Sequence, residues 1–459
     1  MSDDSKKHIA TAELTPESTN LFPRKFGPTP EFIRGDGPYL YDRDGTEYFD
    51  GIGGNQCSNI GHGVESVATA AAEQMKQLEY TSSMLFVSDR SQEFATKMAT
   101  FLPDGFEHVW MVSGGSEANE SAIKLAREYH RETGSPEKHV VIGRRLSFHG
   151  NTLGTLAASG IVSRREPYAS PYMDWPKAPA AYPYRCRFCA DEGECREHGV
   201  ECAKELETVI RDFGSRHVAA FIAEPVGGAA NAAVVPGEEY FRTVREICDR
   251  HDVLMIVDEV MSGMGRTGEN FAIEHWDVTP DIITCAKGMS AGYTPLAGTM
   301  PRSDIVEVFA EKADGFTHGH TYSFNPTSCA IGTAVLEYME EHDVVGNARE
   351  VGSYARDRFE EFYEYDFVGD VRGKGLMLGV EFVADRETKA PLENGGPEFR
   401  ENLLQTALEE RITVYPGGGS VDGERGDHVL ITPPLTITQK QADEMIDRLH
   451  ATFERLDIE

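Results

Sequence analysis

Positive charge is what this 459-residue chain most lacks. Its 44 basic residues face 76 acidic ones, a formal net charge of -32, and only 14 of the basic residues are lysines. Such an acidic surface would repel nucleic-acid phosphates and anionic lipid headgroups, so we expect no nucleic acid and no membrane among its partners. Acid excess with few lysines is the composition we expect of a halophile-like protein from a salt-rich cytoplasm, and an ordinary acidic protein is the alternative.

Long hydrophobic runs and a dense set of cysteines are also missing. No run approaches the roughly 18 apolar residues that a membrane span needs, and residues 1–14 contain no apolar core of signal-peptide length. Eight cysteines do not indicate a disulfide framework in a chain of this size. These absences predict a cytoplasmic protein.

The chain's length and pattern predict three units. Residues 1–65 form an N-terminal arm and a hairpin around Asp44-Gly45, and we expect them to join a small domain. Residues 66–330 form a large domain with a Cys-rich, loop-like insertion at about 180–203. Residues 331–459 form a smaller C-terminal α+β domain.

Short apolar runs alternate with helical patterns through the large domain, which indicates an α/β fold with a mostly parallel sheet flanked by helices. The runs are residues 108–112, 139–143, 218–226, 253–260 and 281–286. In an open parallel sheet, ligands bind at the edge where the carboxyl ends of the strands meet. Candidate groups lie at all five carboxyl ends, and they are Gly115 with Ser116, Phe148 with His149, Glu224, Asp258 and Lys287.

Three of these features together match the needs of pyridoxal phosphate. A desolvated Lys287 has a lowered pKa and can form a Schiff base with an aldehyde, although this stretch alone also fits a lysine that reaches to water. Asp258 ends an apolar strand, where a carboxylate needs a cation, either a protonated pyridine nitrogen or a side chain such as Arg266. Gly115 and Ser116 open a helix whose free N–H groups suit a phosphate.

Residues 263–268 fit the dinucleotide pattern GxGxxG but do not predict a Rossmann site. That site needs an amphipathic helix to begin there, whereas the sequence continues as ENFAIEHWDVTPD, which is aromatic and irregular.

From about Tyr39 to its end, the chain resembles a class III, ω-amino acid:pyruvate type aminotransferase, a pyridoxal-phosphate enzyme of fold type I. The matching segments are GSEANESAIKLAR, SFHGNTLG, AEPVGG, DEVMSGMGRTG, AKGMSAGYTPLAG, HGHTYSFNP and GDHVLITPPL. The resemblance implies a homodimer or higher oligomer that moves an amino group from an amine or ω-amino acid to pyruvate or another 2-oxo acid. A pyridoxal-phosphate aminomutase or decarboxylase on the same scaffold is an alternative, and a catalytically dead metal-binding or interaction protein is a weaker one.

The resemblance also implies a role for each site residue. Lys287 would hold the cofactor covalently and move the proton, Asp258 would pair with the ring nitrogen, and Glu224 would shape the site near the cofactor's oxygen. The other implied cofactor contacts are Gly115 and Ser116 at the phosphate, Phe148 and Val260 on the two ring faces, His149 beside them, and Thr321 reaching the phosphate from the partner subunit.

The substrate residues are harder to assign. Relatives that use pyruvate often place an arginine where this chain has Gly423; Arg425 lies nearby as a substitute, and a solvated loop arginine is the alternative. Relatives that act on aromatic amines often carry a tryptophan where Gln56 aligns, so a polar residue there favours a small, polar or carboxylated amine. Phe86 is a third candidate in the substrate pocket.

Four cysteines lie in the insertion, namely Cys186, Cys189, Cys195 and Cys202. The first two have the CxxC spacing of a tetrahedral zinc site, and the later two would complete a structural zinc centre. The later pair lacks that spacing, so a reduced-thiol loop without metal is the alternative. We expect no catalytic role for this cluster.

Overall fold

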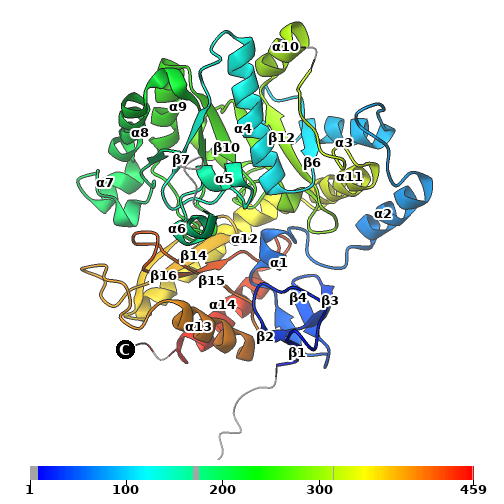
Figure 1. Ribbon diagram of the computed structural model, residues 1–459. Helices are drawn as coiled ribbons and strands as arrows, with labels where there is room; N and C mark the ends of the chain where they lie inside the picture. The colour runs from blue at the N-terminus through cyan, green and yellow to red at the C-terminus, as the bar shows by residue number, and fades with distance from the viewer. Residues whose placement is uncertain (1–8, 169–174, 314, 457, 459) are drawn as a thin grey trace, which may run out of the picture.

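Figure 1 shows the computed structural model, which describes residues 9–168, 175–313, 315–456 and 458. Its central sheet has seven strands in the order β6-β12-β11-β10-β9-β7-β8. Only β12 runs antiparallel to its neighbours. The strands are β6 (Trp110–Val112), β7 (Val140–Arg144), β8 (Lys177–Ala178), β9 (Val218–Ala223), β10 (Leu254–Asp258), β11 (Ile282–Cys285) and β12 (Ala297–Pro301).

All five predicted apolar runs contain strands of this sheet, so the predicted mostly parallel α/β fold is confirmed. The sequence AGTMP of β12 contains a glycine and a proline and carries no strand signal. It is a strand because it pairs with both β6 and β11.

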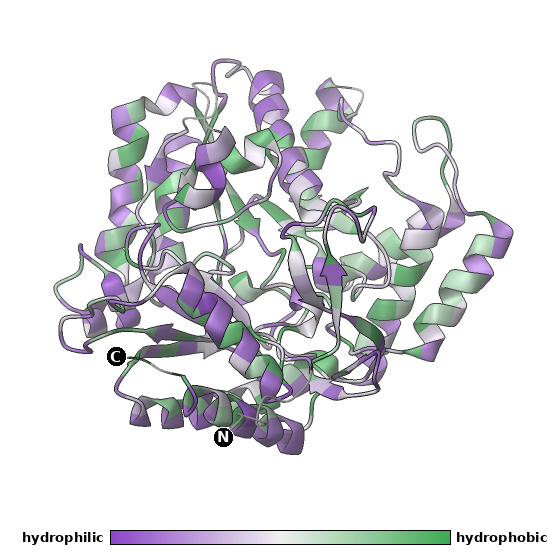
Figure 2. Cartoon of the chain, turned by 60° about the horizontal axis from the view of Figure 1, so that its bottom comes forward, coloured by the Kyte–Doolittle hydropathy of each residue, from purple (hydrophilic) through white to green (hydrophobic). Residues whose placement is uncertain are grey.

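Helices cover both faces of the sheet, which explains why most residues of its strands are apolar and buried. Alternate residues point to opposite faces: Ile256 of β10 joins the core beneath α4 (Gly115–Glu132), whereas Met255 joins the core on the other face with α8 (Val200–Phe213) and α9 (Tyr240–His251). Figure 2 shows hydrophobic colour on the central strands and hydrophilic colour on much of the surrounding helices.

The remaining helices of the large unit lie around this sandwich. They are α2 (Glu65–Gln77), α3 (Asp89–Ala99), α5 (Leu153–Ala158), α6 (Val162–Arg165), α7 (Glu192–Glu197), α10 (Ser303–Lys312) and α11 (Pro326–Glu341). The insertion at 180–203 is therefore partly helical, not a plain loop as its sequence indicated. Among the described residues, no helix is both long and apolar enough to cross a membrane.

Three smaller sheets lie in the lower part of the molecule in Figure 1. The N-terminal part contains the pair β1 (Thr11–Leu14) and β2 (Gly27–Pro30), a sheet of β3 (Phe32–Asp36), β4 (Tyr39–Asp42) and β5 (Glu47–Phe49), and the short α1 (Gly53–Gln56). The predicted hairpin at Asp44-Gly45 is the β4–β5 pair. Backbone hydrogen bonds from Phe49 N to Arg411 O and from Thr413 N to Phe49 O tie this part to the C-terminal unit.

The C-terminal sheet has the order β13-β14-β16-β15. Its elements are α12 (Val344–Phe359), β13 (Val368–Lys374), β14 (Met377–Phe382), α13 (Pro397–Glu409), β15 (Tyr415–Gly418), β16 (Asp427–Ile431) and α14 (Gln439–Phe453). β15 comes from a glycine-rich stretch, YPGGG, which has little strand preference. The YPGG of β15 fits only an edge strand, which is the place it takes.

The predicted domain border at residue 331 falls inside α11. Because α11 packs against α2 and α3 whereas α12 packs against α14, we propose that the border lies between α11 and α12. The domain border near residue 65, between the N-terminal unit and the large unit, stays a proposal.

Candidate active site

A cavity of about 470 Å³ lies at the carboxyl ends of the central strands. Eight of the residues that the sequence singled out line it, although they come from separate segments of the chain. These are Gly115, Ser116, Phe148, His149, Glu224, Asp258, Val260 and Lys287. The structure therefore brings together the predicted lysine, carboxylates and phosphate turn.

Lys287 lies two residues after the end of β11 and has a partly buried side chain. Its φ of 45° lies in the left-handed region, which is uncommon for a residue with a side chain. Its Nζ donates a hydrogen bond to Oε1 of Gln56 at 2.9 Å. Burial lowers its pKa from 10.5 to about 8. The lysine therefore faces the cavity, as a reactive amine requires, and does not reach out to bulk water.

Asp258 is buried, and three hydrogen bonds hold its carboxylate. Its Oδ2 accepts hydrogen bonds from Nδ2 of Asn119 and Nδ1 of His149, both at 2.8 Å, and its Oδ1 accepts one from Val260 N at 3.1 Å. Asn119 is fixed in turn, because Thr284 Oγ1 donates to its Oδ1 at 2.7 Å. The sequence analysis included Asn119 in the GSEAN motif but gave it no role.

Arg266 is not the partner of Asp258, although the sequence left that option open. Its fully buried guanidinium donates to Leu376 O, Pro433 O and Asn59 Oδ1. Burial lowers its pKa to about 9. The described residues thus supply Asp258 with no arginine or lysine partner, and its carboxylate is available to a cationic ligand.

The turn before α4 has the form of an anion cradle. Gly114 caps the helix in an extended conformation, and the first N–H groups of α4 have no acceptors within the helix. A Cβ on Gly115 would lie 2.8 Å from Cγ1 of Val260, so only glycine fits where this turn meets the cavity wall. Ser116 Oγ lies at the same turn and accepts from Asn151 N at 3.2 Å.

Two buried polar atoms at the cavity wall have no hydrogen-bond partner in the described part of the chain, Oε2 of Glu224 and Nε2 of His149. Burial raises the pKa of Glu224, whose Oε1 accepts from Gly228 N at 3.2 Å. Unpaired buried groups are costly, so their presence indicates a polar ligand. The donor set, the glycine cradle and these two atoms fit pyridoxal phosphate.

Thr321 and Phe86 lie elsewhere. Both line a second cavity of about 550 Å³, together with Tyr80, Trp110 and His320. Phe86 is 62 % exposed. Thr321 does not line the cavity that holds Lys287 of the same chain, and its role at a neighbouring subunit's site stays a prediction.

Arg425 lies on the surface: its side chain is 68 % exposed and its Nε contacts Oδ2 of Asp422 at 2.8 Å. A different arginine lies beside the cavity. The guanidinium carbon of Arg164 is 4.5 Å from the centre of the Phe148 ring, and its Nη2 donates to Tyr415 OH at 3.2 Å. No sequence pattern points to Arg164, because only folding places α6 next to Phe148.

A mostly parallel α/β sheet with a partly buried lysine, an aspartate and an anion cradle at its carboxyl edge defines a pyridoxal-phosphate enzyme of fold type I. The chain belongs to the class III aminotransferase family, whose model matches residues 27–453. This membership confirms the predicted family and its aminotransferase class.

Individual proteins that resemble this chain are also aminotransferases. The chain is 37 % identical to the uncharacterized aminotransferase YodT of Bacillus subtilis, over 89 % of this chain and 91 % of YodT. It is 32 % identical to a putrescine–pyruvate aminotransferase of Pseudomonas aeruginosa, over 90 % of this chain and 88 % of that protein. The pyridoxal-phosphate-bound crystal structure of an amine transaminase from an uncultivated Pseudomonas species superposes with a TM-score of 0.87 at 32 % identity, covering 98 % of this chain and 100 % of that chain.

Proposed function

We propose that this aminotransferase moves an amino group from an amine or ω-amino acid to pyruvate or another 2-oxo acid. The observation that carries the proposal is the cavity in which the partly buried Lys287 meets Asp258 and the α4 cradle. Relatives whose names state amine or putrescine substrates support the donor class.

Pyridoxal phosphate, when bound, supplies an aldehyde that combines with amines and a ring that accepts carbanion charge. Lys287 has the lowered pKa that this chemistry needs: at pH 7 about a tenth of its amine is uncharged, against about three in ten thousand at the ordinary pKa. Its Nζ would hold the cofactor through the aldehyde, and as a free amine it would be the base that accepts and returns the proton at the substrate carbon.

The other residues of the cavity would bind the cofactor and orient it. Asp258, fixed by Asn119 and His149, keeps a carboxylate in place for a protonated ring nitrogen. The N–H groups at Gly115 and Ser116 would bind the phosphate at the positive end of α4. Phe148 and Val260 would provide apolar surfaces for the ring, and Glu224 would shape the site near the cofactor's oxygen.

We propose Arg164 as the group that binds a substrate carboxylate, in place of Arg425. Arg164 contacts Phe148 at the cavity wall and has no carboxylate partner among the described residues, whereas Arg425 is paired with Asp422 on the surface. Gly423 lies against α6, since its Cβ would be 3.0 Å from Cγ2 of Val162. Gly423 is the position at which pyruvate-using relatives often have an arginine. Arg164 is two residues from Val162, the residue that Gly423 faces, so it can take the place of that arginine.

A homodimer or a higher oligomer with shared sites is the assembly we propose. Met84, Leu85, Phe86 and Val87 form an apolar surface, and each is at least 62 % exposed in the single chain. Such a patch favours burial against another protein surface. Thr321 lies in the second cavity near this patch, where a neighbouring copy would meet it. The cytoplasmic location and the salt-rich habitat inferred from composition stay predictions.

The visible spectrum tests the proposed reaction. We expect the absorbance band of the Lys287-bound cofactor to disappear when an amine donor is added and to return with a 2-oxo acid. A protein that stays colourless with added pyridoxal phosphate would refute the proposal. A donor that is decarboxylated or isomerised, with no amino group appearing on the 2-oxo acid, would favour the decarboxylase or aminomutase alternative.

A panel of donors and acceptors tests the substrate residues. Arg164→Gln should raise KM for carboxylated substrates about tenfold or more, the effect of losing one charge-assisted hydrogen bond, and leave uncharged amines little changed. Arg425→Gln is the matched control and should change neither. If Arg425→Gln has the larger effect, the assignment is reversed.

A further inference from the structure

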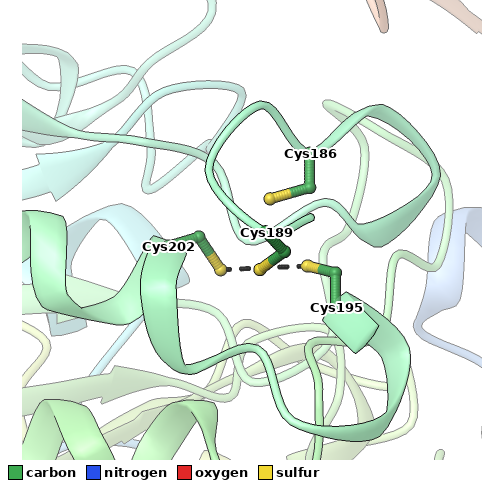
Figure 3. Close-up of side chains that lie close together, drawn as sticks. All are labelled: Cys186, Cys189, Cys195 and Cys202. Atoms are coloured by element: carbon green, nitrogen blue, oxygen red, sulfur yellow. Dashed lines mark hydrogen bonds between the residues drawn. The ribbon is translucent and has the colours of Figure 1, made fainter. Parts of the chain in front are cut away.

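The four cysteines of the insertion converge on one point in the folded chain. Cys186 and Cys189 follow the short 3-10 turn Pro183–Arg185, Cys195 lies on α7 and Cys202 on α8. Their sulfur atoms all lie within 4.8 Å of one another, and the Sγ atoms of Cys195 and Cys202 are 4.0 Å apart (Figure 3). Cys195 and Cys202 are buried, and the other two are half-buried.

This spacing matches a single tetrahedral metal ion. Zn–S bonds of about 2.3 Å in a tetrahedron separate the sulfurs by about 3.8 Å, close to the spacing found here. A disulfide would instead bring two sulfurs to about 2.05 Å, and all four cysteines are free. A group of thiols that only packs as apolar surface has no reason to bring four sulfurs from three segments within reach of one centre.

We propose that Cys186, Cys189, Cys195 and Cys202 bind one Zn²⁺ ion as a structural site. Four thiolate ligands close the tetrahedral shell and leave no position for a substrate or water. None of the four lines the active-site cavity. The sequence left this site undecided because Cys195 and Cys202 lack CxxC spacing. In the folded chain, α7 and the start of α8 bring these two cysteines close to each other and to Cys186 and Cys189.

The position of the site assigns it a mechanical role. The chain neighbour of Cys186 is Arg185, whose Nε contacts Oε1 of the buried Glu381 of β14 at 2.6 Å. The chain neighbour of Cys195 is Arg196, whose Nη2 contacts Oδ1 of the buried Asp370 of β13 at 2.7 Å. The zinc ion would therefore fix the backbone from which two arginines reach the C-terminal sheet.

Metal analysis of the full-length protein, purified without chelator, tests the site. We expect about one zinc per chain. Zinc near zero, or iron at that stoichiometry with the colour of an iron–thiolate centre, would overturn the proposal.

Variants locate the ion. Cys186→Ser with Cys189→Ser should lose zinc, and Cys248→Ala, which changes a buried free cysteine on α9, should retain it. Zinc that persists in the double variant would show that the ion is bound elsewhere. Where that variant does not fold, stepwise modification of wild-type thiols with a mercurial reagent replaces it. Zinc release should then follow the modification of the four cluster cysteines, identified by peptide mapping, and release while these four stay unmodified would contradict the site.

Chelation tests the mechanical role. Zinc-free protein should unfold at a lower temperature than zinc-loaded protein while keeping the absorbance of the bound cofactor, because the two sites share no residues. Equal unfolding temperatures would refute the role of the ion in holding the C-terminal sheet. Neither result depends on turnover, so failure of the proposed transamination would be seen separately.

Discussion

The reactivity of Lys287 makes the most direct prediction. The lysine lies at the edge of an apolar sheet, and burial lowers its pKa from 10.5 to about 8. The charges of Asp258 and Glu224 act in the opposite direction but are outweighed by desolvation. A shift of this size corresponds to about 3 kcal/mol of preference for the uncharged amine.

The assay is the rate at which cofactor-free protein captures pyridoxal phosphate at its lysine, followed by absorbance from pH 6 to 10. The uncharged amine is the reactive form, so the rate should rise with pH and level off above about 8. At pH 7 the uncharged fraction should exceed that of an ordinary lysine by about 300-fold. N-acetyl-lysine amide is the matched reference, whose rate should keep rising toward pH 10.5.

Two controls make the result specific. Lys287→Ala should abolish the absorbance band of the lysine-bound cofactor. Borohydride reduction should attach the cofactor to Lys287 alone among the 14 lysines. A capture rate with a midpoint near 10.5 would refute the reasoning that burial activates this amine. Labelling of a different lysine would refute its assignment.

Three further substitutions test the surroundings of the site. Glu259 is fully buried, and burial raises its pKa to about 7, so ionising it destabilises the folded state by an amount that is absent below pH 4.5 and complete above about 7. The free energy of unfolding of Glu259→Gln, measured with denaturant, should therefore rise relative to wild type by up to about 3 kcal/mol between pH 5 and 8. A difference that stays constant with pH would contradict this. Gly115→Ala places a Cβ 2.8 Å from Val260 and should weaken pyridoxal-phosphate binding in equilibrium dialysis by about tenfold or more, whereas unchanged affinity would show that the cradle adapts. Arg266→Met leaves three buried acceptors unpaired and should destabilise the fold by about 2–4 kcal/mol in urea unfolding; a smaller loss would mean that desolvating the guanidinium costs as much as its hydrogen bonds contribute.

The sequence by itself determined the central sheet and the identity of the chemistry. Continuous apolar runs have no stable place except a sheet covered on both faces, so β7, β9, β10 and β11 could be located from composition and spacing. The residues that follow these strands could then be assigned to one edge, because parallel strands present their carboxyl ends together. Lys287, Asp258 and the Gly115 turn were found in this way.

Tertiary structure alone decided the contacts made by side chains that are remote in sequence. Asn119 and His149, not Arg266, hold Asp258; Arg164 reaches Phe148 while Arg425 turns to the surface; and four cysteines with irregular spacing meet at one point. Strands such as β12 and β15, rich in glycine and proline, exist because neighbours pair with them. Local sequence carries periodicity and backbone preference, whereas these contacts depend on the packing of whole elements, which no short stretch encodes.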